Sequence, residues 1–147
     1  MFYYFSFVRI LEYMERTNMG RVMGVDFGTK RIGIALADEN GAMAFPVMVV
    51  KNDKLLIPTL SSFIKDKGVN LVVIGESKDF KMKDNPIMEA IRAFAKTLEN
   101  EVGVEIDYEP EFLTSHQAHH IQGKTDMLDA SAAAIILQSY LERNNNK

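Results

Sequence analysis

The stretch Arg21–Asp38, which reads RVMGVDFGTKRIGIALAD, decides how the chain folds. The apolar residues up to Val25 predict a first β-strand, Arg31–Ala37 predicts a second, and Phe27–Lys30 is a tight connection between them. Asp26 stands out, because a carboxylate at the end of a buried strand is costly to desolvate unless it is paired, hydrogen-bonded or bound to a metal. Taken alone, the stretch favours an ordinary hairpin whose aspartate caps the turn, so the rest of the chain has to decide its role.

The overall composition is that of one globular domain with a hydrophobic core. The chain has 147 residues, of which 47% are hydrophobic and 25% are charged. It contains no cysteine, which excludes disulfides and thiolate metal sites. The formal net charge is −3, so a nucleic acid would have to be held by a local basic patch or through metal ions, because a global positive field is absent.

The sequence predicts an N-terminal extension over residues 1–18, a domain over 19–143 and a tail over 144–147. The apolar, aromatic run at the start is only eight residues long before charges follow, which is too short to span a membrane. It also lacks the basic start and the cleavage site of a secretory signal, so we expect a cytoplasmic protein. Two interpretations of the extension stay open: a short helix that docks on the domain or a partner, or an upstream start codon before Met19.

Beyond the hairpin, the patterns predict strands that alternate with helices. The turn residues Asp38–Gly41 lead into a third strand over 42–50, which Pro46 places at the edge of a sheet. There follow a helix ending at Lys67, an apolar strand over 69–75, a helix starting at Asn85 and Pro86, a strand over 102–108, a short helix after Thr114, and a last helix over 126–143. This order predicts an α/β fold in which helices flank a five-stranded mixed sheet. Three antiparallel strands come first and parallel strands follow, with the first strand at the centre of the sheet.

Several carboxylates are expected at one rim of this sheet, where functional groups collect at strand ends. Asp26 ends the first strand, Glu76 follows the fourth, Glu111 follows the fifth, and Asp126 and Asp129 share a face at the start of the last helix. Clustered carboxylates repel unless a cation holds them, and hard oxygen ligands suit Mg²⁺ or Mn²⁺. A pair of such ions can activate water for phosphodiester hydrolysis.

Each acid also has a structural interpretation. Asp129 can be a first-turn carboxylate favoured by the helix dipole, and Asp126 can be the helix cap. Glu76 and Glu111 can be solvated loop residues.

The positive charges near these strand ends are candidates for phosphate contacts. Gly28 and Gly33 would let a phosphate or a second strand approach the backbone closely. The lysines and the arginine predicted to bind nucleic acid are Lys30, Arg31, Lys78, Lys81, Lys83 and Lys124, although Lys30 and Arg31 are equally compatible with surface charges.

Four segments resemble one family of proteins. Gly24–Ala35 resembles the opening motif of the YqgF family, also called RuvX, of Holliday junction resolvase-like proteins, and 72–75 is similar to that family's fourth strand. Leu113–Ser115 resembles its Leu-Thr-Ser segment, and Asp129–Leu141 its C-terminal helix. The resemblance covers about 20–142.

This resemblance implies a ribonuclease H-like fold and a nuclease that uses two Mg²⁺ or Mn²⁺ ions. Asp26 matches the family's first-strand catalytic aspartate, Asp129 matches its helix aspartate, and Glu111 matches its third acid, although the usual flanking aspartate and arginine are absent. Glu76 is an alternative third acid, by similarity to a fourth-strand glutamate of the related resolvase RuvC.

The resemblance leaves the substrate open between structured RNA, such as the end of the pre-16S ribosomal RNA, and branched DNA. Cutting a DNA junction symmetrically requires two active sites and hence a homodimer, whereas trimming an RNA does not. A non-catalytic RNA-binding or ribosome-assembly factor is the alternative, because the third-acid segment is altered. Actin-like sugar kinases open with a similar hairpin, but they need two such lobes and the chain supplies one.

Overall fold

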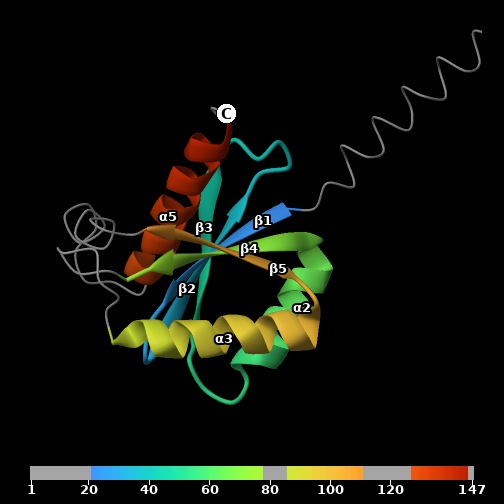
Figure 1. The fold of residues 1–147 in the computed structure, drawn as a ribbon. Helices are drawn as coiled ribbons and strands as arrows, with labels where there is room; N and C mark the ends of the chain where they lie inside the picture. Colours follow the sequence, from blue (N-terminus) through green and yellow to red (C-terminus); the bar gives the residue numbers. More distant parts are fainter. Residues whose placement is uncertain (1–20, 78–85, 111–126, 146–147) are drawn as a thin grey trace, which may run out of the picture.

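A computed structural model describes residues 21–77, 86–110 and 127–145 (Figure 1). The predicted N-terminal extension, the short helix after Thr114, and the side chains of Glu111, Asp126 and four candidate lysines lie outside these ranges. The elements are β1 (Arg21–Phe27), β2 (Arg31–Ala37), β3 (Ala44–Lys51), α2 (Leu56–Lys67), β4 (Val69–Glu76), α3 (Ile87–Val102), β5 (Glu105–Pro110) and α5 (Met127–Asn145).

The five strands form one mixed sheet in the order β3-β2-β1-β4-β5. The strand β1 is antiparallel to its neighbour β2 and parallel to its other neighbour β4, which confirms that the first strand lies at the centre. The edge strand β3 carries Pro46, as predicted, and its register with β2 shifts between Ile34 and Ala35. The parallel pairing of β4 with β5 completes the sheet.

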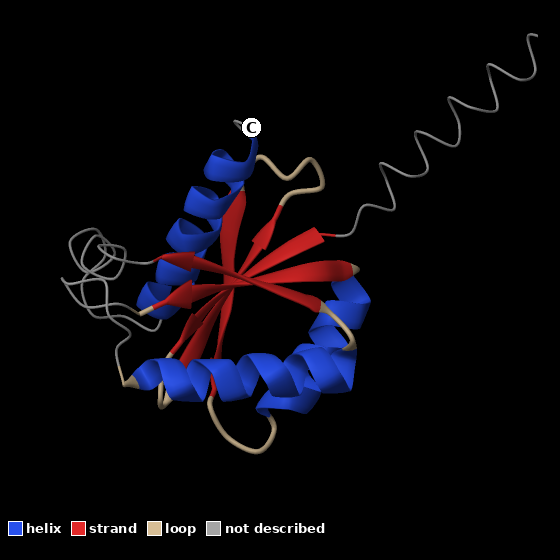
Figure 2. Ribbon diagram, in the orientation of Figure 1, coloured by secondary structure: helices blue, strands red, loops and turns tan. Residues whose placement is uncertain are grey.

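Helices cover both faces of the sheet (Figures 1 and 2). The helices α2 and α3 pack on one face over a core that includes Met23, Val25 and Ile74. The helix α5 crosses the other face over a smaller, alanine-rich core that includes Ala35 and Leu137. Because β1 and β4 are covered on both sides, their side chains alternate between the two cores, and this alternation decides which acids can meet.

Two glycines end the helices that precede parallel strands. Gly68 and Gly103 both adopt left-handed conformations, with φ of 66° and 77°. The prediction of a strand starting at residue 102 was wrong: Val102 is the last residue of α3, and β5 begins at Glu105. The backbone N–H of Gly103 donates to the carbonyl of Glu99, so this glycine caps a helix.

Several other boundaries shift by one or two residues. The third strand starts at Ala44, because the side chain of Asp38 accepts hydrogen bonds from the N–H groups of residues 42 and 43 and holds them in the turn. Pro86 immediately precedes α3, whose first residue is Ile87. The last helix continues past Arg143 to Asn145, whose side chain donates to the carbonyl of Gly41. None of the helices in the described ranges is long and apolar enough to cross a membrane.

Candidate functional site

Asp26 lies near the end of β1 with its side chain on the α5 face of the sheet. Val22, four residues earlier on the same strand, packs against the core beneath α5. A Cβ atom on Gly24 would lie 2.7 Å from the Cβ of Leu137, so this position also faces α5. Since side chains alternate along a strand, Asp26 points to the same face, and it is half-buried.

The first turn of α5 packs against the residue that pairs with Asp26 in the β-sheet. Asp26 is paired with Gly33 on β2, and paired residues direct their side chains to the same face. A Cβ atom on Gly33 would lie 1.8 Å from the carbonyl oxygen of Asp129, so only a glycine lets the helix approach this closely. The glycine thereby brings Asp26 and Asp129 to one face at one end of the sheet.

Arg31 forms an ion pair with Asp129. Its Nε atom lies 3.4 Å from Oδ2 of Asp129, and the two side chains are 53% and 30% exposed. Arg31 precedes Gly33 by two residues on β2 and therefore stands on the same face of the sheet. As the sequence suggested, Asp129 also lies in the first turn of a helix, where the dipole favours a carboxylate.

The turn that carries Lys30 and Arg31 is tied to the end of β3. The side chain of Asn52 donates to the carbonyl of Gly28 at 3.0 Å, and its backbone N–H donates to the carbonyl of Lys30 at 2.9 Å. A Cβ atom on Gly28 would lie 2.4 Å from the carbonyl oxygen of Arg31, so the turn is tightly folded. These contacts fix the backbone from which the two positive side chains extend.

Glu76 lies at the same end of the sheet but on the opposite face. Val72 and Ile74 pack in the core beneath α2 and α3, whereas Val73 packs beneath α5. Because side chains alternate along a strand, Glu76 points to the same face as Val72 and Ile74. Its charge also acts on Tyr108, which packs against that same core. Burial raises the pKa of Tyr108, Arg92 opposes this rise, and Glu76 adds to it. The structure therefore does not bring Glu76 together with Asp26 and Asp129.

Glu109 is a buried carboxylate that the sequence interpretation missed. The predicted strand over 102–108 ends before it, but it belongs to β5 and is only 4% exposed. Its carboxylate accepts a hydrogen bond from Oγ of Ser139 at 3.1 Å and pairs with Arg143 at 2.5 Å. Ser139 lies roughly 15 Å along α5 from Asp129 at a rise of 1.5 Å per residue, so Glu109 anchors the helix and does not join the acid pair.

A second polar contact joins the same two elements. The hydroxyl of Tyr140 donates to Oδ2 of Asp107 at 2.7 Å, and the guanidinium of Arg143 lies 5.7 Å from the centre of the tyrosine ring. Burial, together with the hydrogen bond to Asp107, raises the pKa of Tyr140 to about 12. The alternation in β5 indicates that Asp107 and Glu109 lie on the same polar face of the strand. Only the tertiary structure shows that residues of α5 supply their hydrogen-bond and ion-pair partners.

Asp26 and Asp129 supply the type of oxygen ligand that a hard divalent cation takes. Carboxylate oxygens are preferred ligands of Mg²⁺, which commonly uses one or two carboxylates and keeps water or phosphate oxygens in its other positions. Within the described ranges no group of three or more His, Cys, Asp or Glu residues could hold a metal ion. A third protein ligand would therefore have to come from the rest of the chain, where Glu111 lies.

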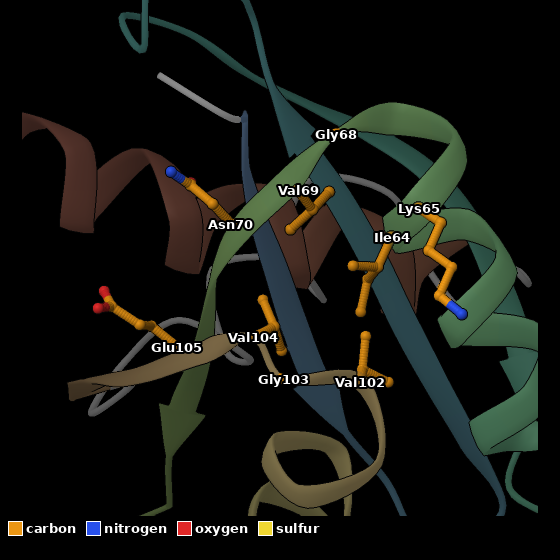
Figure 3. A pocket seen from close by; sticks show the side chains of 9 residues that line it. All are labelled: Ile64, Lys65, Gly68, Val69, Asn70, Val102, Gly103, Val104 and Glu105. Carbon is orange, nitrogen blue, oxygen red and sulfur yellow. The ribbon is translucent and has the colours of Figure 1, made fainter. Parts of the chain in front are cut away.

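A pocket of about 430 Å³ lies at the opposite end of β4 and β5 (Figure 3). It opens where the two strands begin, and Ile64, Val102 and Val104 point toward one another inside it. Its charged lining residues are Lys65 and Glu105. The pocket therefore lacks a pair of acids, and it is separated from Asp26 by the length of the strands.

Comparison with solved structures shows a ribonuclease H-like fold, as the family resemblance implied. RuvC of Thermus thermophilus, solved in complex with a Holliday junction substrate, matches with a TM-score of 0.55 at 15% identity, over 86% of this chain and 96% of that one. The fowlpox virus resolvase, solved with Holliday junction DNA, matches with a TM-score of 0.52 at 13% identity, over 84% of this chain and 98% of that one.

Curated relatives are more similar in sequence. A protein of Moorella thermoacetica named "Putative pre-16S rRNA nuclease" is 34% identical over 133 residues, which are 84% of this chain and 95% of the relative. A protein of Bacillus subtilis with the same name is 33% identical over 137 residues, which are 85% of this chain and 99% of the relative. The profile of the family described as "RuvX: Holliday junction resolvase" matches residues 20–143, and the chain belongs to this RuvX family.

Proposed function

We propose that the protein is a divalent-metal-dependent nuclease that hydrolyses phosphodiester bonds at the end of the pre-16S ribosomal RNA. The observation that carries this proposal is the contact between Gly33 and the backbone of Asp129. This contact supports the proposal, because the strand acid Asp26 is paired with that same glycine and therefore stands on the face that the helix acid approaches. Membership of a family whose relatives are named as nucleases supports the same activity.

Three acids are assigned to metal binding. Asp26 and Asp129 would hold the ions, and Glu111 would complete the ligand set from outside the described ranges. When bound, Mg²⁺ or Mn²⁺ would supply an activated water and neutralise the charge that develops on the leaving oxygen. Glu76 is not included, because its side chain belongs to the other face of the sheet.

The basic residues of the hairpin would position the nucleic-acid backbone. Lys30 is exposed, and Arg31 is half-exposed beside the acid pair. Phosphate contacts of this kind set the register without reading sequence. Further contacts are proposed for residues outside the described ranges, namely Lys78, Lys81, Lys83 and Lys124.

An RNA substrate is favoured over a DNA junction by the relatives. The two proteins that are 34% and 33% identical carry ribosomal RNA nuclease names, whereas the likeness to junction-bound resolvases is at 15% identity or below and concerns the fold alone. An RNA precursor would place the protein in the cytoplasm and requires no homodimer. A junction substrate would require two active sites.

Cleavage assays with two acid variants test the proposal. The wild type, Asp26→Asn and Asp129→Asn are incubated with Mn²⁺ and either an RNA that spans the pre-16S end or a four-way DNA junction. Asp66→Asn is the matched control, because Asp66 is an exposed carboxylate in the last turn of α2. We expect cleavage of the RNA by the wild type and the control, and a loss of at least about 100-fold in both acid variants.

Three results would contradict parts of this proposal. Full activity of Asp26→Asn would exclude the assigned acids. Cleavage of the junction and not of the RNA would overturn the substrate. Tight RNA binding by a wild type that cuts neither substrate would support an assembly factor instead.

A further inference from the structure

We propose that Arg31 has two alternating partners: it neutralises Asp129 while no metal is bound, and it moves to a phosphate of the nucleic acid once a metal takes that carboxylate. The inference rests on the proposed function, since it concerns the same acid pair. It assigns Arg31 a part in metal loading as well as in substrate binding.

The ion pair has the geometry of a replaceable contact. The Nε atom of Arg31 lies 3.4 Å from Oδ2 of Asp129, and just over half of the arginine side chain is exposed. Exposed ion pairs are weak, because water screens the charges and both side chains lose conformational freedom. A divalent cation at Asp129 carries twice the charge of the guanidinium and would displace it.

The backbone around Arg31 is held in place, so the exchange needs only the side chain to move. Asn52 ties both Gly28 and Lys30 to the end of β3. On the other side, Gly33 is pressed against the backbone of Asp129. A long side chain that extends from a fixed strand end can swing between the helix acid and a bound strand of nucleic acid without rearranging the fold.

The chemistry of the guanidinium suits both partners. Its planar donors match carboxylate and phosphate oxygens alike. Without a metal, two carboxylates at one rim would repel each other, and the ion pair of Arg31 with Asp129 would reduce this repulsion. With a metal on Asp129, the guanidinium would exchange that carboxylate for a phosphate oxygen.

Titration with Mg²⁺ in the absence of nucleic acid tests the first half of the exchange. The wild type is compared with Arg31→Gln and Arg31→Lys, using the amide NMR signals of Asp26 and Gly33. Arg21→Gln is the matched control, because Arg21 forms an ion pair with Glu39 at 3.3 Å, and Lys30→Gln measures the effect of removing a neighbouring charge. We expect Arg31→Gln to bind Mg²⁺ about two- to fivefold more tightly than the wild type. Arg31→Lys and the control should stay near the wild-type affinity, and Lys30→Gln should tighten binding less than Arg31→Gln.

RNA binding tests the second half. Without metal, Arg31→Gln should change the dissociation constant of a pre-16S end RNA by less than about twofold, because Asp129 already offsets the charge of the arginine. With Mg²⁺, the same substitution should raise KM several-fold at a smaller change in kcat, because a phosphate contact is lost. A purely structural role of Arg31 would lower stability without producing this metal-dependent difference.

The outcomes separate this inference from the proposed function. If the wild type binds Mg²⁺ and Arg31→Gln binds it equally or more weakly, the exchange is wrong while the nuclease assignment stands. An equal effect of Arg31→Gln on RNA binding with and without metal would also overturn it. If none of the proteins binds Mg²⁺, both the exchange and the metal-dependent function fail.

Discussion

Gly33 lies directly beneath the carbonyl group of Asp129, so closely that a Cβ atom on the glycine would come within 1.8 Å of the oxygen. The same glycine is the β-sheet partner of Asp26. One residue without a side chain therefore sets the position of the helix acid relative to the strand acid. This contact brings the motif around Asp26 and the distant C-terminal helix to the same end of the sheet.

The substitution Gly33→Ala should disrupt the site more than a glycine-to-alanine substitution at any other position of the sheet. The methyl would meet rigid backbone, so the first turn of α5 must move away from β2. We expect a loss of about 1–3 kcal/mol in the free energy of unfolding, and a loss of metal-dependent cleavage larger than stability explains. Urea denaturation and cleavage assays on the same preparation measure both effects.

Gly24→Ala provides the comparison. Its methyl would also meet α5, at the carbonyl of Ala133 and at the side chain of Leu137, which lie about one and about two turns beyond Asp129. It should destabilise the protein by a similar amount and reduce cleavage less. Equal losses of cleavage in the two variants at equal stability would show that Gly33 has no special role in placing the acids.

The buried ion pair of Glu109 should make Arg143 important for stability. Arg143→Met removes the partner of a carboxylate that is 4% exposed, while Ser139 remains as its hydrogen-bond donor. We expect a loss of about 1–3 kcal/mol in the free energy of unfolding, since a buried charge is left with one partner. The double variant Glu109→Gln with Arg143→Met should recover part of this loss, because no buried charge remains. A double variant less stable than Arg143→Met would contradict this account.

Tyr140→Phe should change how stability depends on alkaline pH. The pKa of Tyr140 is raised from 10.0 to about 12 in the folded protein, so folding favours the neutral hydroxyl. Its contribution is fully present below pH 10 and is lost as the pH rises from about 10 to about 12. Up to pH 9, the free energy of unfolding of the wild type should therefore exceed that of Tyr140→Phe by about 0.5–3 kcal/mol. At pH 11 this difference should be smaller. A difference that stays constant from pH 8 to pH 11 would show that burial and the hydrogen bond to Asp107 do not keep the hydroxyl in its neutral form.

Much of the fold follows from local patterns in the sequence. The bounds of β2 agree with the prediction, because turn residues flank an apolar run on both sides. The end of α2 at Gly68 and the edge position of Pro46 follow from what these two residues do to the backbone. The start of β5 was misplaced, because the alternating residues after Val102 resemble a strand although Gly103 acts as a helix cap.

The site could be predicted only in part. Asp26 and Asp129 were singled out from their places at a strand end and a helix start, and the structure brings these two residues to one rim. The face of Glu76 could not be predicted, because β4 is apolar on both sides and its pattern carries no alternation. The ion pair of Arg31 with Asp129 joins residues 98 positions apart in the sequence, which local patterns cannot reveal.

A double-mutant cycle on cleavage tests most directly the claim that Asp26 and Asp129 form one metal-binding unit. Rates of Mn²⁺-dependent cleavage are measured for the wild type, Asp26→Asn, Asp129→Asn and the variant with both substitutions. If the two acids act together, removing the second costs little once the first is gone, and the double variant should lie within about threefold of the slower single variant. Losses that multiply across the two substitutions would contradict the account, because they would show that the acids act independently.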